Sequence, residues 1–303
     1  MKAIVLTGTT SMVGMALIKQ CIQNNIMVFA LVRPNSNKLD LIPKSNLIKV
    51  LDCDLEGLSI CKKFDVPLKG CTFYHIGWCD NDRKGRESCD KQLKNVRYTL
   101  DAVHLAQKLG CTSFIGIGSQ EEYGLVSKPL TGLTFCCPIT PTGIAKYAAG
   151  IFSKIECKNK NIEHIWVRLL STYGVNDHDD RLIKTFIKRC KSNIVMKLSS
   201  CSHIWDYLFE DDVGKALIKI GQKGHAGKVY PLGSGVGRPL KDYLEIIKDK
   251  INPNYEPEYG EKLYGDDSIR YLCADIAELT ADTGWKPEIS FEKGIEKVIA
   301  SSK

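Results

Sequence analysis

Residues 7–14 read TGTTSMVG and directly follow a short apolar run, KAIVL, at residues 2–6. Gly8 and Gly14 bracket Ser11 in this stretch, and the apolar residues that come next continue as a predicted helix. A strand, a tight glycine turn and a helix N-terminus together form a cradle for a diphosphate, because free N–H groups and the helix dipole both point at it. The stretch therefore predicts a nucleotide site in the first βαβ unit of the chain.

Short apolar runs alternate with helical stretches through the first half of the chain. The runs typical of strands are IMVFALVR (26–33), NLIKVLDC (46–53), CTFYHIGW (71–78) and CTSFIGIGS (111–119). Residues 91–110 predict a core-facing helix, because apolar residues recur near the helical period before a terminal glycine: Leu93, Val96, Leu100, Val103, Leu109, then Gly110. The alternation predicts an α/β fold with a parallel sheet and helices on both faces.

The pattern changes after about residue 169. It loosens into shorter pieces richer in proline and glycine, such as NPNYEPEYGEKLYGDD at residues 252–267, and closes with two helical stretches. This change predicts two lobes. Residues 1–168 form the nucleotide-binding domain, segments near residues 203–235 return to it, and residues 169–303 form mainly a smaller substrate-binding lobe.

Composition excludes several classes of protein. The net charge of +7 is spread along the 303 residues without a basic run, which favours small anionic substrates over nucleic acid. The thirteen cysteines are scattered apart from Cys136 and Cys137, without metal-ligand spacing, so we expect reduced packing residues and no metal site. The longest apolar runs are too short to cross a bilayer, and no signal-peptide core follows Met1, so we expect a cytoplasmic protein that does not enter membranes.

The end of the second predicted strand indicates which dinucleotide binds. An NAD-binding unit offers an acidic side chain to the ribose hydroxyls at this point, whereas this chain has Arg33. A guanidinium makes charge-assisted hydrogen bonds to a 2′-phosphate that a carboxylate would repel. Arg33 therefore favours NADP(H) over NAD(H).

Several motifs give the chain a specific resemblance that runs nearly from end to end. TGTTSMVG resembles a TGxxGxxG loop with Ser11 for the middle glycine, YHIGW (74–78) resembles HxAA, and GSQEEYG (118–124) resembles SSxxVYG. VRLLSTYG (167–174) resembles RxxNVYG, WDYLFEDDVGKAL (205–217) resembles RDFxxVxDVAxA, and residues 275–295 match a DxxKxxxxLGWxPxxxxxxGI ending. In these motifs the chain resembles the extended short-chain dehydrogenase/reductases that act on nucleotide-activated sugars. FYHIGW, GSQEEYG and RPLKDY (238–243) look nearest to reductases of the CDP-abequose synthase type.

The resemblance implies a Rossmann-type doubly wound parallel sheet with a smaller C-terminal α/β substrate lobe. It implies cofactor contacts at Gly8, Ser11, Met12, Gly14, Arg33, Asp54, Leu55, Ile76, Gly77 and Lys146. It also implies substrate contacts at Trp78, Gln120, Glu121, Ser171 and Arg270. A homodimer through the helices around residues 91–109 and 143–157 is implied in the same way.

The catalytic residues follow the family's pattern with one departure. Ser119 falls on the catalytic Ser/Thr, and Lys146 falls on the lysine of YxxxK, which binds the nicotinamide ribose and lowers the pKa of the catalytic tyrosine. Thr142 stands where that tyrosine belongs. An aliphatic hydroxyl does not become an acid useful at neutral pH, so we expect Thr142 to bind a sugar oxygen or a water. Tyr147 follows Lys146 directly and should point away from it along the helix, so it does not replace the phenol. Tyr123 and Tyr173 are better candidates, but tyrosines of such YG turns are more often packing residues.

Three hypotheses remain on the sequence. The first is an NADPH-dependent reductase of a nucleotide-linked 4-keto sugar, with the alkoxide steadied by Ser119 and Thr142. The second is a nucleotide-sugar epimerase, and the third is a nucleotide-binding regulatory or scaffold protein that lost its chemistry with the tyrosine. Dehydration is disfavoured, because Gln120 and Glu121 replace the Asp-Glu pair of the dehydratases.

Overall fold

The computed structural model describes residues 1–61, 64, 68–260 and 269–302. Its central feature is a seven-stranded sheet in the described part of the chain, with the strand order β10-β6-β5-β4-β1-β2-β3. The strands are β1 (Ala3–Thr7), β2 (Met27–Val32), β3 (Ile48–Asp52), β4 (Thr72–His75), β5 (Ser113–Ser119), β6 (Glu163–Leu169) and β10 (Val229–Leu232). All neighbouring pairs are parallel, which confirms the predicted doubly wound sheet.

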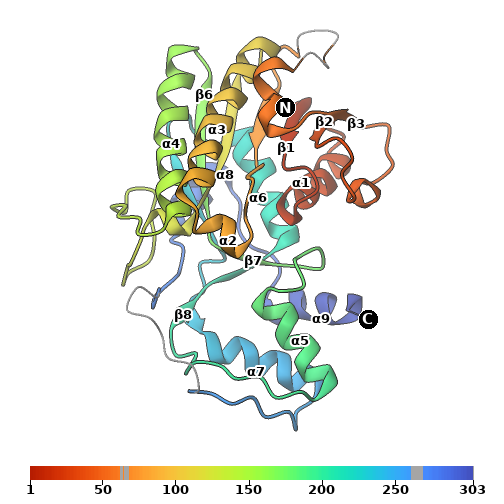
Figure 1. The fold of residues 1–303 in the computed structure, drawn as a ribbon, viewed down its shortest axis with the longest axis vertical. Coiled ribbons are helices and arrows are strands. Elements are labelled where there is room, and N and C mark those ends of the chain that lie inside the picture. Colours follow the sequence, from red (N-terminus) through yellow and green to blue (C-terminus); the bar gives the residue numbers. More distant parts are fainter. Residues whose placement is uncertain (62–63, 65–67, 261–268, 303) are drawn as a thin grey trace.

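Helices cover both faces of this sheet. Helices α3 (Cys89–Leu109) and α4 (Pro141–Asn159) lie side by side on one face, and α1 (Met12–Gln23) and α6 (Glu210–Lys223) lie on the other (Figure 1). Alternate residues of β1 enter the two cores: Ile4 and Leu6 pack toward α1 and α6, and Val5 packs toward α3. Because both faces are covered, the strands are apolar at nearly every position, which explains their continuous apolar runs.

The predicted end of the long helix at Gly110 is correct, whereas one core prediction on the same helix is wrong. Ser11 is the N-cap of α1, and Gly110 ends α3 with a φ of 74°. Val96, Val103 and Leu109 are buried in the core as expected, Leu100 is half-buried, and Leu93 is 65% exposed. The helical period of α3 places Leu93 about a quarter-turn away from the line of residues that packs against the sheet. Leu93, in the first turn of the helix, therefore stays on the surface.

The second lobe has its own apolar core. It is built from α5 (Leu182–Ser192), α7 (Leu240–Ile251) and α9 (Phe291–Ser301), which lie below the sheet in Figure 1. Two short strand pairs join the lobes: β7 (Ser171–Tyr173) with β9 (Tyr207–Phe209), parallel, and β8 (Ile204–Trp205) with β11 (Arg238–Pro239), antiparallel. Residues 261–267 of the proline- and glycine-rich stretch lie outside the described residues.

The remaining elements are short and lie mostly in the connections. They are α2 (Arg83–Arg86), α8 (Ala277–Thr283) and the 3₁₀ helices η1 (Leu39–Leu41), η2 (Leu55–Ile60) and η3 (Gln120–Glu122). Three elements that follow residue 169 belong to the sheet layer: β10 is a strand of the central sheet, and α6 and α8 pack on it. The division of the chain at residue 168 stays a prediction. No helix in the described ranges is long and apolar enough to cross a membrane.

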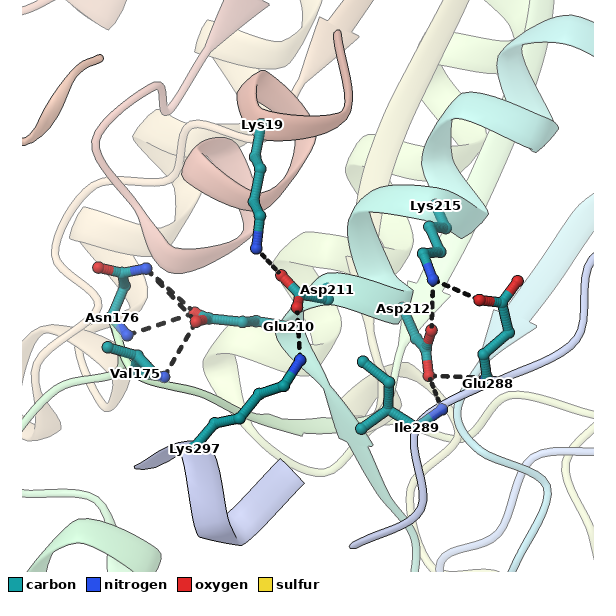
Figure 2. Close-up of polar contacts among 10 residues, drawn as sticks. All are labelled: Lys19, Val175, Asn176, Glu210, Asp211, Asp212, Lys215, Glu288, Ile289 and Lys297. Atoms are coloured by element: carbon teal, nitrogen blue, oxygen red, sulfur yellow. Dashed lines mark hydrogen bonds and ion pairs between the residues drawn. The ribbon is translucent and has the colours of Figure 1, made fainter. Parts of the chain in front are cut away.

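The acidic start of α6 ties the two lobes together (Figure 2). Glu210 accepts the backbone N–H groups of Val175 and Asn176 at 3.0 and 3.3 Å, in the loop after β7. Asp212 is fully buried and accepts the N–H groups of Glu288 and Ile289 at 2.9 and 2.8 Å, in the segment before α9. Acidic side chains are also favourable beside the positive end of the helix dipole. These carboxylates therefore fix where the second lobe meets the sheet.

Candidate functional site

Two adjoining cavities open at the carboxyl edge of the central sheet. The glycine-loop cavity has a volume of about 460 Å³ and is lined by the loop after β1, the end of β2 and the end of β4. The central cavity has a volume of about 580 Å³ and lies between that edge and the second lobe. Five residues line both cavities: Ser11, Ile76, Trp78, Asn81 and His178. The strand order reverses at β1 and β4, which is the point where parallel α/β sheets bind ligands.

The glycine loop packs directly against neighbouring backbone segments, because Gly8 and Gly14 have no side chains. The space in front of the loop is therefore left for a ligand. Gly8 has a φ of 71°, and a Cβ on it would lie 2.6 Å from the backbone nitrogen of Gly77. A Cβ on Gly14 would lie 2.3 Å from the carbonyl oxygen of Gly8. Ser11, at the place of the family's middle glycine, donates to Gly8 O at 2.7 Å and accepts from Gly14 N at 3.0 Å. The loop therefore fits a dinucleotide, with the N-terminus of α1 facing its diphosphate.

Cationic and hydroxyl side chains stand at the β2 end of the glycine-loop cavity. Arg33, Ser36 and Lys38 line it there. Asp54 and Leu55 line it as well, and Asp54 caps η2 by accepting the N–H of Leu55 at 2.7 Å. Seven of the predicted cofactor residues thus line one cavity: Gly8, Ser11, Arg33, Asp54, Leu55, Ile76 and Gly77. Met12 lines the central cavity instead, and Gly14 lies behind the loop.

A buried histidine holds the loop after β4 in place. Thr7 Oγ1 accepts the N–H of Gly77 at 3.1 Å and lies 3.0 Å from His75 Nδ1. The other ring nitrogen of His75 lies 3.2 Å from Thr99 Oγ1. Burial, with a contribution from the nearby charge of Lys146, lowers the pKa of His75 to about 3, so its ring is neutral. The ring therefore serves as a fixed hydrogen-bonding link between β1, β4 and α3.

Ser119 is the last residue of β5 and the N-cap of η3, where it forms a capping box with Glu122. Its Oγ accepts the N–H of Glu121 at 3.2 Å, and its own N–H donates to Glu122 Oε1 at 2.8 Å. Glu122 is fully buried, where it also meets Arg168 Nε at 2.8 Å and Trp166 Nε1 at 3.0 Å. Because the cap uses the hydroxyl oxygen of Ser119 as acceptor, its hydrogen remains a donor that lines the central cavity.

Lys146 lies in the second turn of α4 and is only 7% exposed. Its ammonium donates to the carbonyl oxygen of Ile117 at 2.6 Å and stands 3.8 Å over the ring of Trp78. The pKa of Lys146 is lowered to about 7, chiefly by burial; the negative charge of Glu122 opposes this shift, and the positive charge of Arg86 adds to it. A lysine in this environment changes charge near neutral pH.

The hydroxyl of Thr142 has a backbone acceptor of its own. Thr142 is 3% exposed and lines the central cavity, and its Oγ1 donates to the carbonyl oxygen of Arg86 at 3.0 Å. Arg86 makes an ion pair with Glu121, which also accepts the hydroxyl of Thr140 at 2.7 Å. A Cβ on Gly143 would lie 2.4 Å from the carbonyl oxygen of Glu121, so α4 starts in direct contact with η3. The hydroxyl hydrogen of Thr142 is thus directed at α2, and the side chain also lines the cavity.

The predicted substrate residues divide into those that line the central cavity and one that does not. Trp78, Gln120, Glu121 and Ser171 line it, and Ser171 Oγ donates to Gln120 Oε1 at 3.3 Å. Arg270 has an exposed side chain outside the lining, although its charge acts on His203, which belongs to the lining. The phenols of Tyr123 and Tyr173 donate to the carbonyls of Thr131 and Phe291, away from the cavity.

Several lining residues were not predicted from the sequence. They are Arg86, Asp177, His178, Arg181, His203, Trp205 and Tyr207. A signal for Arg86 was present, because NDRKGRES (81–88) directly follows the fourth strand, and loops after parallel strands build the site. Most of the others come from the second lobe, where no spacing in the sequence shows which loop folds back over the sheet.

Comparison with known families agrees with this geometry. The model of the NAD dependent epimerase/dehydratase family matches residues 4–233. The chain belongs to that family. The match spans the glycine loop, Ser119, Lys146 and the last strand of the sheet, and it confirms the resemblance inferred from the motifs.

Three known proteins are similar over nearly the whole chain. CDP-abequose synthase from Salmonella muenchen is 26% identical over 308 residues, with 99% of this chain and 97% of the relative covered. UDP-glucuronic acid 4-epimerase from Bacillus cereus, solved with UDP-glucuronic acid and NAD, has a TM-score of 0.84 at 17% identity and coverages of 99% and 98%. RMD from Pseudomonas aeruginosa, solved with NADPH, has a TM-score of 0.79 at 19% identity and coverages of 99% and 99%.

Proposed function

We propose that the protein reduces a nucleotide-linked 4-keto sugar with NADPH. The observation that supports this most is the meeting of Ser119 and Lys146 in a cavity that adjoins the glycine loop. A ketone in the central cavity would lie beside a hydroxyl donor and an ammonium, next to the cradle of the dinucleotide. The similarity to CDP-abequose synthase over 99% of the chain supports a nucleotide-linked sugar as the substrate.

The residues of the chain divide the work of binding between the two cavities. The backbone of residues 8–14 would hold the diphosphate, Asp54 and Leu55 the adenine, and Lys146 the nicotinamide ribose. The reduced cofactor supplies a hydride when it is bound. Ser119 donates a hydrogen bond to the ketone oxygen as negative charge grows on it, and Gln120 and Ser171 orient the sugar ring.

The β2 end of the glycine-loop cavity favours reduction over epimerisation. Arg33, Ser36 and Lys38 together offer charge-assisted hydrogen bonds to a 2′-phosphate. An epimerase returns its own hydride and gains nothing from the cellular NADPH pool. The ion pair of Glu121 with Arg86 also disfavours dehydration, because it removes that carboxylate as a base.

The test is NADPH consumption with 4-keto-6-deoxy sugars linked to CDP, dTDP and UDP. We expect oxidation of NADPH with one of them and a 4-hydroxy product with a single configuration. Interconversion of two sugars without net loss of NADPH would establish the epimerase instead. Binding of nucleotide sugars without any conversion, using protein shown to bind NADPH by calorimetry, would establish the scaffold.

A further inference from the structure

Reduction of a ketone requires one hydride at carbon and one proton at oxygen. Ser119 ends β5, Thr142 and Lys146 lie at the start of α4, and Arg86 ends α2. These four side chains line the central cavity beside the sheet, whereas His178, His203 and Tyr207 line it from the second lobe. An aliphatic hydroxyl is too weak an acid at neutral pH, and a guanidinium does not release its proton in proteins. Thr142 also directs its hydrogen to Arg86 O. Lys146 is the group in this set that can give up a proton and recover it.

A chain of contacts links Lys146 to Thr142 through Trp78, Gln92 and the end of α2. The ring of Trp78 lies 3.8 Å from the ammonium, and its Nε1 donates to Gln92 Oε1 at 2.8 Å. Gln92 Nε2 in turn donates to the carbonyl oxygen of Gly85 at 3.0 Å. Gly85 and Arg86 are consecutive, so two side chains, Gln92 from α3 and Thr142 from α4, hold the last carbonyl groups of α2. These hydrogen bonds fix the backbone of Arg86, from which its guanidinium extends.

The charged groups that act on Lys146 come from η3 and α2. Glu122 of η3 acts on it with negative charge and is shared with Arg168 of β6. Arg86 of α2 acts on it with positive charge, which its ion pair with Glu121 only partly offsets. His75 of β4 is neutral. Glu156 pairs with His104 of α3 and Lys160 of α4, ten residues beyond Lys146 and about 15 Å along the axis. On α3, Asp101 pairs with Arg97.

We propose that Lys146 is the proton donor to the ketone oxygen, and that Arg86, held in place by Thr142, is a positioning residue that presents its positive charge to this lysine. The proposal rests on the proposed function. In the step, the ketone carbon gains the hydride, the π electron pair of the carbonyl moves onto oxygen, and that oxygen takes a proton from the ammonium. Lys146 is left as a neutral amine and recovers a proton from water before the next turnover.

The surroundings of Lys146 suit this role. An ammonium that is 7% exposed loses most of its hydration, and one carbonyl and one aromatic face replace only part of it. The lowering of its pKa to about 7 agrees with an acid matched to neutral pH. Thr142 in place of a phenol is consistent with this arrangement, since the hydroxyl is needed for α2 and not for proton transfer.

The first experiment titrates Lys146 without substrate or cofactor. Lysine side chains are labelled with ¹⁵N and ¹³C, and the signal of Lys146 is assigned through Lys146→Arg. We expect a midpoint near 7 in the unmodified protein, a higher midpoint in Arg86→Gln, and an unchanged midpoint in the control Arg189→Gln, which alters an exposed arginine on α5. Arg86→Lys keeps the charge and should keep the midpoint low. A midpoint near the ordinary value of 10.5 in the unmodified protein overturns the proposal, whether or not the protein proves to be a reductase.

The second experiment uses the substrate found in the NADPH assay. We expect the rate to fall as pH rises through the midpoint of Lys146, and we expect Arg86→Gln to move this fall to higher pH. Lys146→Arg should lower kcat by roughly 10² to 10⁴ while NADPH still binds, because the cation remains and the transferable proton is lost. Thr142→Val should move the fall in rate in the same direction as Arg86→Gln, because the carbonyl of Arg86 loses the hydroxyl that holds it. Full activity in Lys146→Arg would assign the proton to another group. If no keto sugar is reduced, the proposed function fails and the titration alone decides the state of Lys146.

Discussion

At the scale of single residues, two small hydroxyl side chains stand where the family's pattern has glycine and tyrosine. Ser11 becomes the N-cap of α1 and bridges Gly8 and Gly14. Thr142 holds the carbonyl of Arg86. In both places the hydroxyl satisfies a backbone group, which is the usual role of serine and threonine at helix starts. Each departure from the pattern therefore has a local structural reason.

Cofactor choice is a prediction at this scale. Arg33→Asp should lower the affinity for NADPH and narrow or reverse its preference over NADH, because a carboxylate repels the 2′-phosphate that the guanidinium would bind. Losing one charge-assisted hydrogen bond of about 1.5–3 kcal/mol corresponds to roughly a tenfold to hundredfold weaker binding. Calorimetric titration of both cofactors measures it. Lys44→Asp makes the same charge change at an exposed site outside the cavity and should leave the preference intact. Equal affinities in the unmodified protein would refute the role of Arg33.

At the scale of elements, the loops that form the site are held by buried polar groups behind the cavity. η3 carries Ser119 at its start and is fixed by Glu122, whose carboxylate meets Arg168 and Trp166. The loop after β4 is fixed by His75 through Thr7 and Thr99. These groups are rigid because each has several partners, so the side chains in front of them are positioned before any ligand arrives.

Glu122→Ala should destabilise the fold strongly. Removing the carboxylate leaves Arg168 buried without its ion-pair partner, and breaking one member of a buried pair costs about 3–5 kcal/mol. Urea denaturation followed by circular dichroism gives the free energy of unfolding. Glu256→Ala, at an exposed position of the second lobe, is the matched control and should change it by less than about 0.5 kcal/mol. A loss below about 1 kcal/mol in Glu122→Ala would show that the pair contributes little.

Two buried histidines of the sheet should make stability fall in mild acid. Burial lowers the pKa of His75 to about 3 and of His164 to about 4, from the ordinary 6.5. Below pH 6.5 the unfolded chain therefore binds protons that the folded chain does not, and the free energy of unfolding falls as pH decreases toward those values. Each histidine contributes a slope of up to about 1.4 kcal/mol per pH unit.

Denaturation curves collected from about pH 7 down to about pH 5 test this, within the range where free histidine titrates. His75→Gln should lower the slope, whereas His178→Gln, at an exposed position, should leave it unchanged. The same slope in the unmodified protein and in His75→Gln would mean that other groups cause the acid sensitivity.

At the scale of the whole molecule, the outer surface of α3 and α4 carries exposed apolar side chains. The two helices lie side by side on one face of the sheet (Figure 1). Their exposed apolar side chains are Leu93, Ile144, Ile151, Phe152 and Ile155. The isoleucines of α4 are spaced so that they share one side of the helix. Exposed apolar patches of this kind mark interaction sites, so the homodimer expected from the sequence is proposed to form here.

The double variant Ile151→Lys and Ile155→Lys should convert a dimer into a monomer, because two buried ammonium groups on each side cannot be paired across the interface. Light scattering after gel filtration gives the molar mass of both forms. Ile194→Lys alters an isoleucine of similar exposure in the second lobe and should leave the mass of the dimer unchanged. A monomer in the unmodified protein at micromolar concentration would contradict the proposal.

Much of the fold could be predicted from local sequence alone. Strands buried on both faces are continuous apolar runs, and the glycine turn after β1 follows from the φ of Gly8 and the contact of Gly14 with Gly8, which require residues without a Cβ. Lys146 and Ser119 could be placed because their motifs lie on single elements. These features depend on neighbours close in sequence or on one strand and the helix that follows it.

The rest was decided by contacts between segments far apart in the chain. Whether Thr142 faces a sugar or α2 depends on Arg86, fifty-six positions earlier, and no spacing encodes that hydrogen bond. The ring of Trp78 meets Lys146 only after β4 and α4 have packed on the same edge of the sheet. The acidity of Lys146 depends on burial and on charges from other elements. A residue's type can be read locally, but its hydration and its charged neighbours exist only in the folded protein.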